Sequence, residues 1–155
     1  MRPVSLFLVA TMLALGSLLV PVAWAADHMT VAPKDLKWED VPALPPGAKV
    51  AVIEGPLDQA APFIVRFKFP ANYKVPAHWH PSVEHVTVLS GTLHMGTGDK
   101  LDPKKTHAVS AGSVVIMPAK TNHFGWTKEA TVVQVHGVGP WGITYVDPAD
   151  DPRKK

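Results

Sequence analysis

The sequence predicts an all-β sandwich or barrel. Short runs of strand-like composition recur along the chain, separated by glycine, proline, aspartate and asparagine. Within 62–69 the side chains alternate, so that Phe63, Val65 and Phe67 share one face, as in a half-buried strand. We find no long amphipathic helix in the sequence. The predicted strands are 49–53, 62–69, 83–90, 92–95, 113–117, 123–127, 131–137 and 142–146.

Residues 1–25 have the order of parts expected of a secretory signal peptide. A positive start with Arg2 is followed by the apolar run 4–22 and then by Ala23-Trp24-Ala25, which resembles a cleavage site. The alternative is a retained anchor, because a run of about 19 residues nearly spans a bilayer. Pro21 and the Ala-x-Ala ending favour cleavage after Ala25. We therefore expect a periplasmic or secreted protein with no membrane attachment after cleavage.

Composition excludes several classes of function. The chain has no cysteine, so disulfides, lipid-modified cysteine and thiol nucleophiles are ruled out. Its formal net charge of +2 falls to +1 when Arg2 is removed with the signal peptide. A nearly neutral chain is not expected to bind nucleic acid as its main partner. We expect a small-molecule ligand or substrate instead.

The mature chain of about 130 residues is long enough for one domain with its own core. We expect 48–147 to be the β-barrel domain. Residues 26–47 are polar and rich in proline, which predicts an extended N-terminal arm. Its apolar anchors Leu36, Trp38 and Val41 are expected to pack on the outside of the barrel or on a second subunit. Residues 148–155 are expected to form a charged, loose C-terminal tail.

Three histidines and one glutamate have spacings typical of a mononuclear metal site. His78 and His80 are two apart, so on an extended strand both point to the same face. Glu84 follows after a bend, and the distant His123 reaches them only in a closed or sandwiched sheet. Imidazole suits Zn, Cu, Fe and Ni, and a carboxylate adds an oxygen that favours Fe or Mn. The residues predict one divalent transition-metal ion (Fe, Mn, Zn, Ni or Cu).

The segment 71–127 resembles the two sequence motifs of the cupin superfamily. The shared positions are His78, His80, Glu84 and Gly91 in the first motif and Gly112, Pro118 and His123 in the second. The resemblance implies a cupin-type double-stranded β-helix, or jelly-roll barrel, and the same four metal ligands. The short stretch between the motifs is typical of small single-domain cupins. Fold analogy also implies a homodimer.

Three positions depart from the family pattern. Asn72 stands where the first motif has glycine, and asparagine is the usual replacement when the backbone needs a positive φ. Lys120 replaces a glycine two residues after Pro118, and Thr127 replaces an asparagine. We expect these changes to affect turns and the rim of the site more than the metal.

Gln134 and His136 lie on the same face of the predicted strand 131–137, opposite Val133 and Val135. If the valines face the hydrophobic shell, the polar pair faces the cavity and can hydrogen-bond the ligating histidines. The alternative is a polar face turned outward.

Two functions of different classes remain open. The first is a metal-dependent enzyme, an oxidoreductase resembling the cupin dioxygenases, in which Glu84 acts as a general base. The second is a binding or sensing module resembling the cupin domains of anti-sigma factors. The fold cannot decide between them, but secretion without a regulatory domain favours the enzyme.

Overall fold

The structure, a computed structural model, describes residues 28–155. The predicted signal peptide, 1–25, lies outside these residues. In the described part of the chain no helix is both long and apolar enough to cross a membrane. Residues 31–155 form one compact unit, and the fold below is that of this unit.

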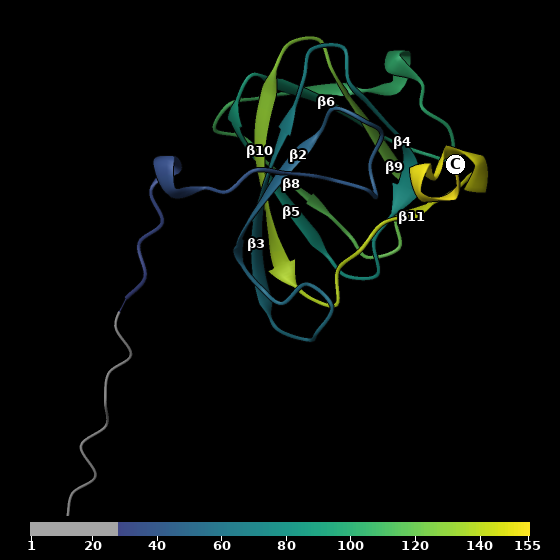
Figure 1. Cartoon of the computed structure of the whole chain (residues 1–155). Helices are drawn as coiled ribbons and strands as arrows, with labels where there is room; N and C mark the ends of the chain where they lie inside the picture. Colours follow the sequence, from purple (N-terminus) through teal and green to yellow (C-terminus); the bar gives the residue numbers. More distant parts are fainter. Residues whose placement is uncertain (1–27) are drawn as a thin grey trace, which may run out of the picture. The chain divides into compact units, whose positions relative to one another are not determined.

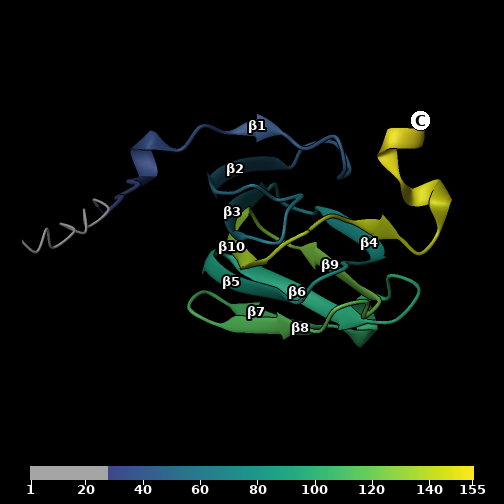
Figure 2. The same ribbon diagram turned by 90° about the horizontal axis from the view of Figure 1, so that it is seen from below.

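Two antiparallel sheets form this unit, which confirms the predicted all-β, double-sheet jelly roll. One sheet has six strands in the order β1-β2-β3-β10-β5-β8, and the other has five in the order β11-β4-β9-β6-β7 (Figure 1). Viewed from below, β1 and β2 lie at the upper edge of the first sheet and β8 at its lower edge (Figure 2). The strands are β1 Glu39–Asp40, β2 Lys49–Glu54, β3 Pro62–Phe69, β4 Lys74–Trp79, β5 Glu84–Ser90, β6 Thr92–Thr97, β7 His107–Ser110, β8 Val114–Met117, β9 His123–Thr127, β10 Thr131–Val138 and β11 Thr144–Tyr145.

The core lies between the two sheets and is built from alternate residues of the strands. On β3 the predicted alternation is confirmed, because Phe63, Val65 and Phe67 are buried while the residues between them are more exposed. β10 runs antiparallel to β3 and adds Val133 and Val135 to the same core. These two strands therefore form the centre of the six-stranded sheet.

Most strand predictions agree with the structure, and those for β3 and β9 agree at both ends. Strands β1, β4 and β7 were not among the predicted runs. β4 contains Pro76, which cannot donate a backbone hydrogen bond and so weakens the strand pattern in the sequence. The register of β4 against β9 shifts between Val75 and His78, so the proline lies at an irregularity. The predicted run 142–146 shortens to β11.

We expected the apolar residues of the N-terminal arm to pack on the outside of the barrel or on a second subunit. The structure shows this arrangement for only part of the arm. Trp38 lies near an outward-facing lysine, with Lys68 Nζ 4.0 Å from its ring centre. Val41 and Leu44, in contrast, pack against the core between the sheets. The prediction was wrong for Val41 because one apolar residue in a proline-rich segment does not show which surface it meets.

Two tyrosine hydroxyls hold the arm in place. Tyr145 Oη donates to Ala43 O at 2.9 Å, and Tyr73 Oη donates to Pro45 O. Burial is the main cause that raises the pKa of Tyr145 to about 12, with the nearby Asp151 carboxylate adding to the shift. The hydroxyl therefore stays protonated and remains a donor at physiological pH.

The C-terminal tail is also more ordered than predicted. It forms two 3-10 turns, Pro148–Asp150 and Pro152–Lys154, near β11 and β4 (Figure 1). Asp151, between them, is buried and accepts a hydrogen bond from Arg153 Nε at 2.7 Å. Arg153 also donates to Ile143 O at 3.2 Å, which ties the tail to the chain before β11.

Candidate metal centre

Both sheets contribute to the cluster of predicted ligands. His78 is on β4, His80 follows directly after this strand, and His123 begins β9, where it pairs in register with His78. Glu84 begins β5 in the six-stranded sheet. All four side chains are buried.

Backbone carbonyl groups fix the orientation of the three histidines. Nδ1 of His78, His80 and His123 lies 2.6, 2.7 and 2.9 Å from the carbonyl oxygens of Pro76, Gly142 and Thr121. A carbonyl oxygen only accepts hydrogen bonds, so each Nδ1 must carry the proton. In the neutral rings the lone pair is then on Nε2, the tautomer needed to bind a metal ion.

The ring nitrogens converge as a metal site requires. Among the described residues His78, His80 and His123 form one group whose ligand atoms all lie within 4.8 Å of one another. His80 Nε2 is buried and has no hydrogen-bond partner in the protein. A buried nitrogen without a partner is costly, and a metal ion would satisfy it. The histidines therefore fit a metal ion.

Glu84 lies beside two of the histidines but is not a member of that group. Its Oε1 is 3.5 Å from His80 Nε2, and its Oε2 is 3.5 Å from His123 Nε2. With metal–ligand distances of about 2.0–2.2 Å, neighbouring ligands of one ion lie about 3.0–3.5 Å apart. The carboxylate is thus placed where a fourth ligand would be.

The electrostatics of the site favour neutral imidazole. Burial is the main cause that lowers the pKa of His78 well below its ordinary value of 6.5, and His123 and His80 lower it further. Burial also lowers the pKa of His80, although the Glu84 carboxylate acts in the opposite direction. Two of the three rings therefore have free Nε2 lone pairs near neutral pH.

A cavity of about 110 Å³ adjoins the four predicted ligands. Except for these ligands and Trp141, its lining is apolar and comes from both sheets and the arm. The other lining residues are Val41, Ala43, Leu44, Phe67, Phe69, Val75, Val86, Leu93, Met95, Gly125, Val133, Val135 and Ile143. The arm thus forms part of the wall, a role that was not expected from its sequence.

Trp141 packs directly on a predicted ligand. Its ring lies 4.9 Å from that of His80, with an angle of 18° between the planes. The next residue, Gly142, provides the carbonyl group that holds His80 Nδ1. The segment after β10 therefore supports His80 on its face and at its edge. Nothing in the sequence spacing pairs Trp141 with His80, because the two are joined only by the fold.

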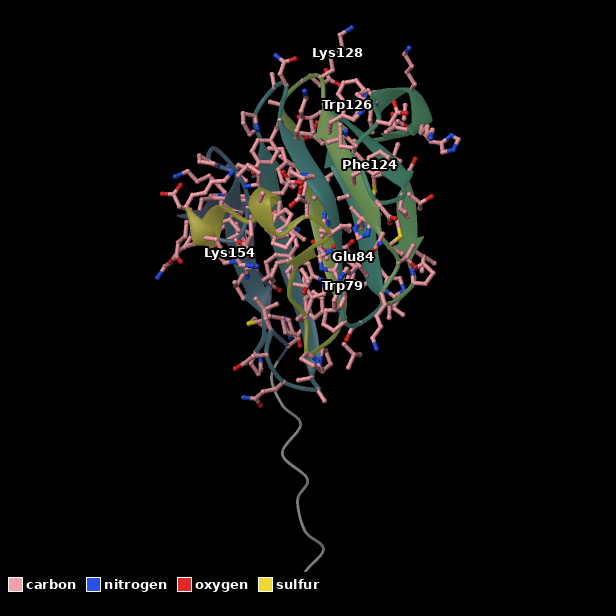
Figure 3. The ribbon with its side chains drawn as sticks, turned by 90° about the vertical axis from the view of Figure 1, so that its right-hand side faces the viewer. Trp79, Glu84, Phe124, Trp126, Lys128 and Lys154 are labelled. Atoms are coloured by element: carbon pink, nitrogen blue, oxygen red, sulfur yellow. The ribbon has the colours of Figure 1, made fainter. Side chains whose placement is uncertain are left out.

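Three aromatic residues close to the ligands in the sequence do not line the cavity. Trp79, between His78 and His80, does not line it. On β9 Gly125 lines the cavity, whereas Phe124 and Trp126 do not. Figure 3 shows these two aromatic side chains along β9.

The prediction that Gln134 and His136 support the ligands was wrong. Val133 and Val135 line the cavity, so the residues that alternate with them on β10 face the other side of the sheet. There Gln134 accepts a hydrogen bond from Arg66 Nε at 3.0 Å. His136 stacks on His85 at 5.0 Å, away from the ligands. Strand alternation showed which residues of β10 share a face but not which of the two faces lines the cavity.

Two of the unusual turn positions have the backbone that glycine would favour. Asn72 and Lys120 both have φ of 59°, so the expectation for Asn72 is confirmed and Lys120 adopts the same conformation. Lys120 N donates to His80 O at 2.8 Å. This turn therefore links the segment before His123 to the segment that carries His80.

Comparison with known proteins is consistent with this architecture. A family model described as Cupin domain matches residues 65–135. A search of curated protein sequences gave no match.

Several solved structures resemble the chain. The polyketide cyclase RemF from Streptomyces resistomycificus has a TM-score of 0.66 at 19% identity and covers 83% of this chain and 92% of its own. A putative acetylacetone dioxygenase from Methylibium petroleiphilum PM1 has a TM-score of 0.62 at 17% identity, covering 83% and 87%. An RmlC-like cupin from Shewanella frigidimarina NCIMB 400 has a TM-score of 0.56 at 15% identity, covering 72% and 89%. At these identities the likeness is one of fold.

The segment matched by the family model contains all four predicted ligands and both turn positions with positive φ. Together with the shared double-sheet fold, this match shows that the chain belongs to the cupin superfamily.

Proposed function

We propose that this protein is a metal-dependent enzyme that acts on a small organic molecule. More specifically, we propose that it is an oxidoreductase of the dioxygenase type. The observation that carries the proposal is the trio of histidines whose Nδ1 atoms are all held by backbone carbonyls while their Nε2 atoms converge beside a cavity. A site used only to stabilise the fold has no need of an adjoining cavity. One of the similar structures is that of a putative acetylacetone dioxygenase, which supports the specific form without establishing it.

His78, His80, His123 and Glu84 would hold one divalent transition-metal ion. A bound ion would supply Lewis-acid or redox chemistry at the end of the cavity that these residues form. The buried apolar walls would exclude bulk water from the reacting molecule and strengthen electrostatic interactions there.

Among the described residues that line the cavity, Glu84 carries the one carboxylate. We assign it a second role as the group that accepts a proton from the substrate. Its oxygens lie 3.5 Å from two histidine nitrogens, which leaves the carboxylate in contact with both the metal ligands and the cavity. Proton transfer by a positioned carboxylate typically contributes about 10²–10⁴-fold to a rate.

The first experiment measures metal content and oxygen uptake together. Protein purified without added metal is analysed for Fe, Mn, Zn, Ni and Cu, and oxygen consumption is followed with a panel of phenols, diketones and thiols. Redox-active metal with substrate-dependent uptake is the expected result. Zinc at full occupancy with no uptake would instead support a binding module, and protein without any metal would contradict both functions.

The variant Glu84→Gln tests the proton-accepting role. The amide preserves the shape of the side chain but is not a base, so turnover should fall by about 10²-fold or more even in protein that still holds metal. Glu129→Gln is the matched control, because Glu129 is exposed and does not line the cavity. Unchanged turnover in metal-loaded Glu84→Gln protein would dismiss the role.

The periplasmic or secreted location and the homodimer stay predictions. Both can be checked on the full-length chain, the first by fractionation of cells that express it and the second by sedimentation of the purified protein.

A further inference from the structure

The polar groups of the cavity all belong to one small set of residues. Among the described residues that line it, there is no lysine, arginine, serine, threonine, asparagine, glutamine or tyrosine. The metal-ligand cluster and the indole of Trp141 are the polar side chains present. A ligand with oxygen atoms all around its skeleton would leave several of them without hydrogen bonds.

The size of the cavity sets a second limit. An apolar cavity of about 150 Å³ takes up benzene, and the cavity here has a volume of about 110 Å³. On this scale the walls enclose a ligand no larger than about the size of benzene. Phe67, Val86 and Val135 are nearly inaccessible to solvent and pack in the core, so the walls that the sheets form cannot withdraw without disturbing that core.

We infer that the substrate is a compact molecule, about the size of benzene, with its oxygen donors on one side and hydrocarbon on the other. The oxygen donors face the metal-ligand cluster, and the hydrocarbon contacts the apolar walls. Sugars, hydroxy acids and dicarboxylates are disfavoured because, among the described lining side chains outside the ligand cluster, the indole N–H of Trp141 is the one donor for their remaining oxygens. This inference rests on the proposed metal site and concerns the substrate class of that same site.

Two small molecules with the same skeleton separate these classes. Pentane-2,4-dione and malonate each have seven non-hydrogen atoms and a 1,3-dicarbonyl frame, but malonate carries oxygen where the diketone carries methyl groups. We expect the diketone to bind cobalt-loaded protein at least about 30-fold more tightly, because malonate would bury two extra charged oxygens and the indole N–H of Trp141 can pair with only one of them. The visible absorption spectrum of the bound cobalt reports binding. 1,3-Diphenylpropane-1,3-dione, which has the same frame but two phenyl groups, should bind more weakly than pentane-2,4-dione because it exceeds the cavity.

A single substitution tests the walls themselves. Val86 lies two residues after Glu84 on β5 and lines the cavity, so Val86→Thr adds a hydroxyl group near the ligand cluster with little change of shape. It should move the preference toward malonate by about tenfold. Val114→Thr is the matched control, because Val114 is 55% exposed on β8 and does not line the cavity.

The outcomes distinguish a failure of the proposed metal site from a failure of the proposed substrate class. Protein that takes up no cobalt contradicts the metal site itself, and this inference with it. Cobalt uptake with malonate bound as tightly as the diketone, with the diphenyl compound bound equally well, or with no response to any of the three overturns the substrate class alone. The ligand series on the unmodified protein decides the matter even if Val86→Thr protein does not fold.

Discussion

Histidine rings pack together on both sides of the six-stranded sheet, and the two groups differ in what holds them. Inside, the Nδ1 atoms of the metal-site trio His78, His80 and His123 are fixed by carbonyl groups, and their ligand atoms converge. On the other face of the six-stranded sheet, His85 and His136 pair in register and stack at 5.0 Å. Nδ1 of each outer ring is buried without a hydrogen-bond partner in the protein. The two outer rings therefore differ from the inner trio in number and in support, because they lack the carbonyl groups that select a tautomer in the metal-site histidines.

Neighbouring positions on one strand separate the two groups. Glu84 and His85 are consecutive on β5, but Glu84 lines the cavity while His85 faces away from it. His85 pairs in register with Ile116, which is 63% exposed. Strand alternation thus assigns one residue to the metal centre and the next to the outer surface.

The largest expected effect follows from removing one ring of each group. His123→Ala should weaken metal binding by at least about 100-fold, because losing only the group that orients a ligand already costs about 10–100-fold. His136→Ala should leave metal affinity unchanged, since its ring does not reach the cavity. Competition with a chromophoric chelator measures both affinities. Equal losses in the two variants would break the distinction between the inner and outer groups.

A smaller effect is expected when the aromatic support of a ligand is removed. Trp141→Leu deletes the ring stacked on His80 and should weaken metal binding by about tenfold, at the lower end of the range for groups around a ligand. Trp141→Phe keeps an aromatic face and should recover most of the affinity. The recovery distinguishes support of His80 from a general loss of packing.

The fold provides a matched control for this substitution. Trp126 stacks on His94 at 4.0 Å with 11° between the planes, so it forms the same kind of pair outside the cavity. Trp126→Leu should therefore reduce stability without changing metal affinity. A comparable loss of affinity would show that the effect of Trp141 is not transmitted through His80.

Much of the fold and the pairing of His78 with His80 could be predicted from the sequence because both depend on local patterns. Alternation in β3 showed which residues are buried, and spacing grouped His78 with His80. The glycine-like backbone of Asn72 also followed from its residue type. These features depend on residues close together in the chain or on the chemistry of a single residue.

The walls and supports of the site could not be predicted in the same way. Trp141 reaches His80 from a loop sixty-one positions later in the sequence, and Val41 reaches the cavity from the arm. For Gln134 and His136 the sequence left both faces open, and the outward one is found, because a strand with polar and apolar sides does not reveal which side another sheet covers. Such contacts depend on how the two sheets and the arm pack.

The smallest expected effect is the pH dependence of stability in the metal-free protein. His78 and His80 have pKa values lowered by burial, so the unfolded chain binds protons more readily than the folded one below the ordinary value of 6.5. The free energy of unfolding must then fall as pH decreases through this range. For each histidine that stays neutral in the folded state, the loss is about 1.4 kcal/mol per pH unit.

Urea unfolding at pH 7.5 and 5.5, with metal removed by a chelator, measures this loss. His78→Gln cannot titrate and should show a smaller loss between the two pH values than the unmodified protein. His107→Gln is the control, because His107 is exposed on β7 and should leave the loss unchanged. If His78→Gln does not reduce the loss, the buried ring is not the source, and the neutral state that prepares the inner histidines for a metal would need another explanation.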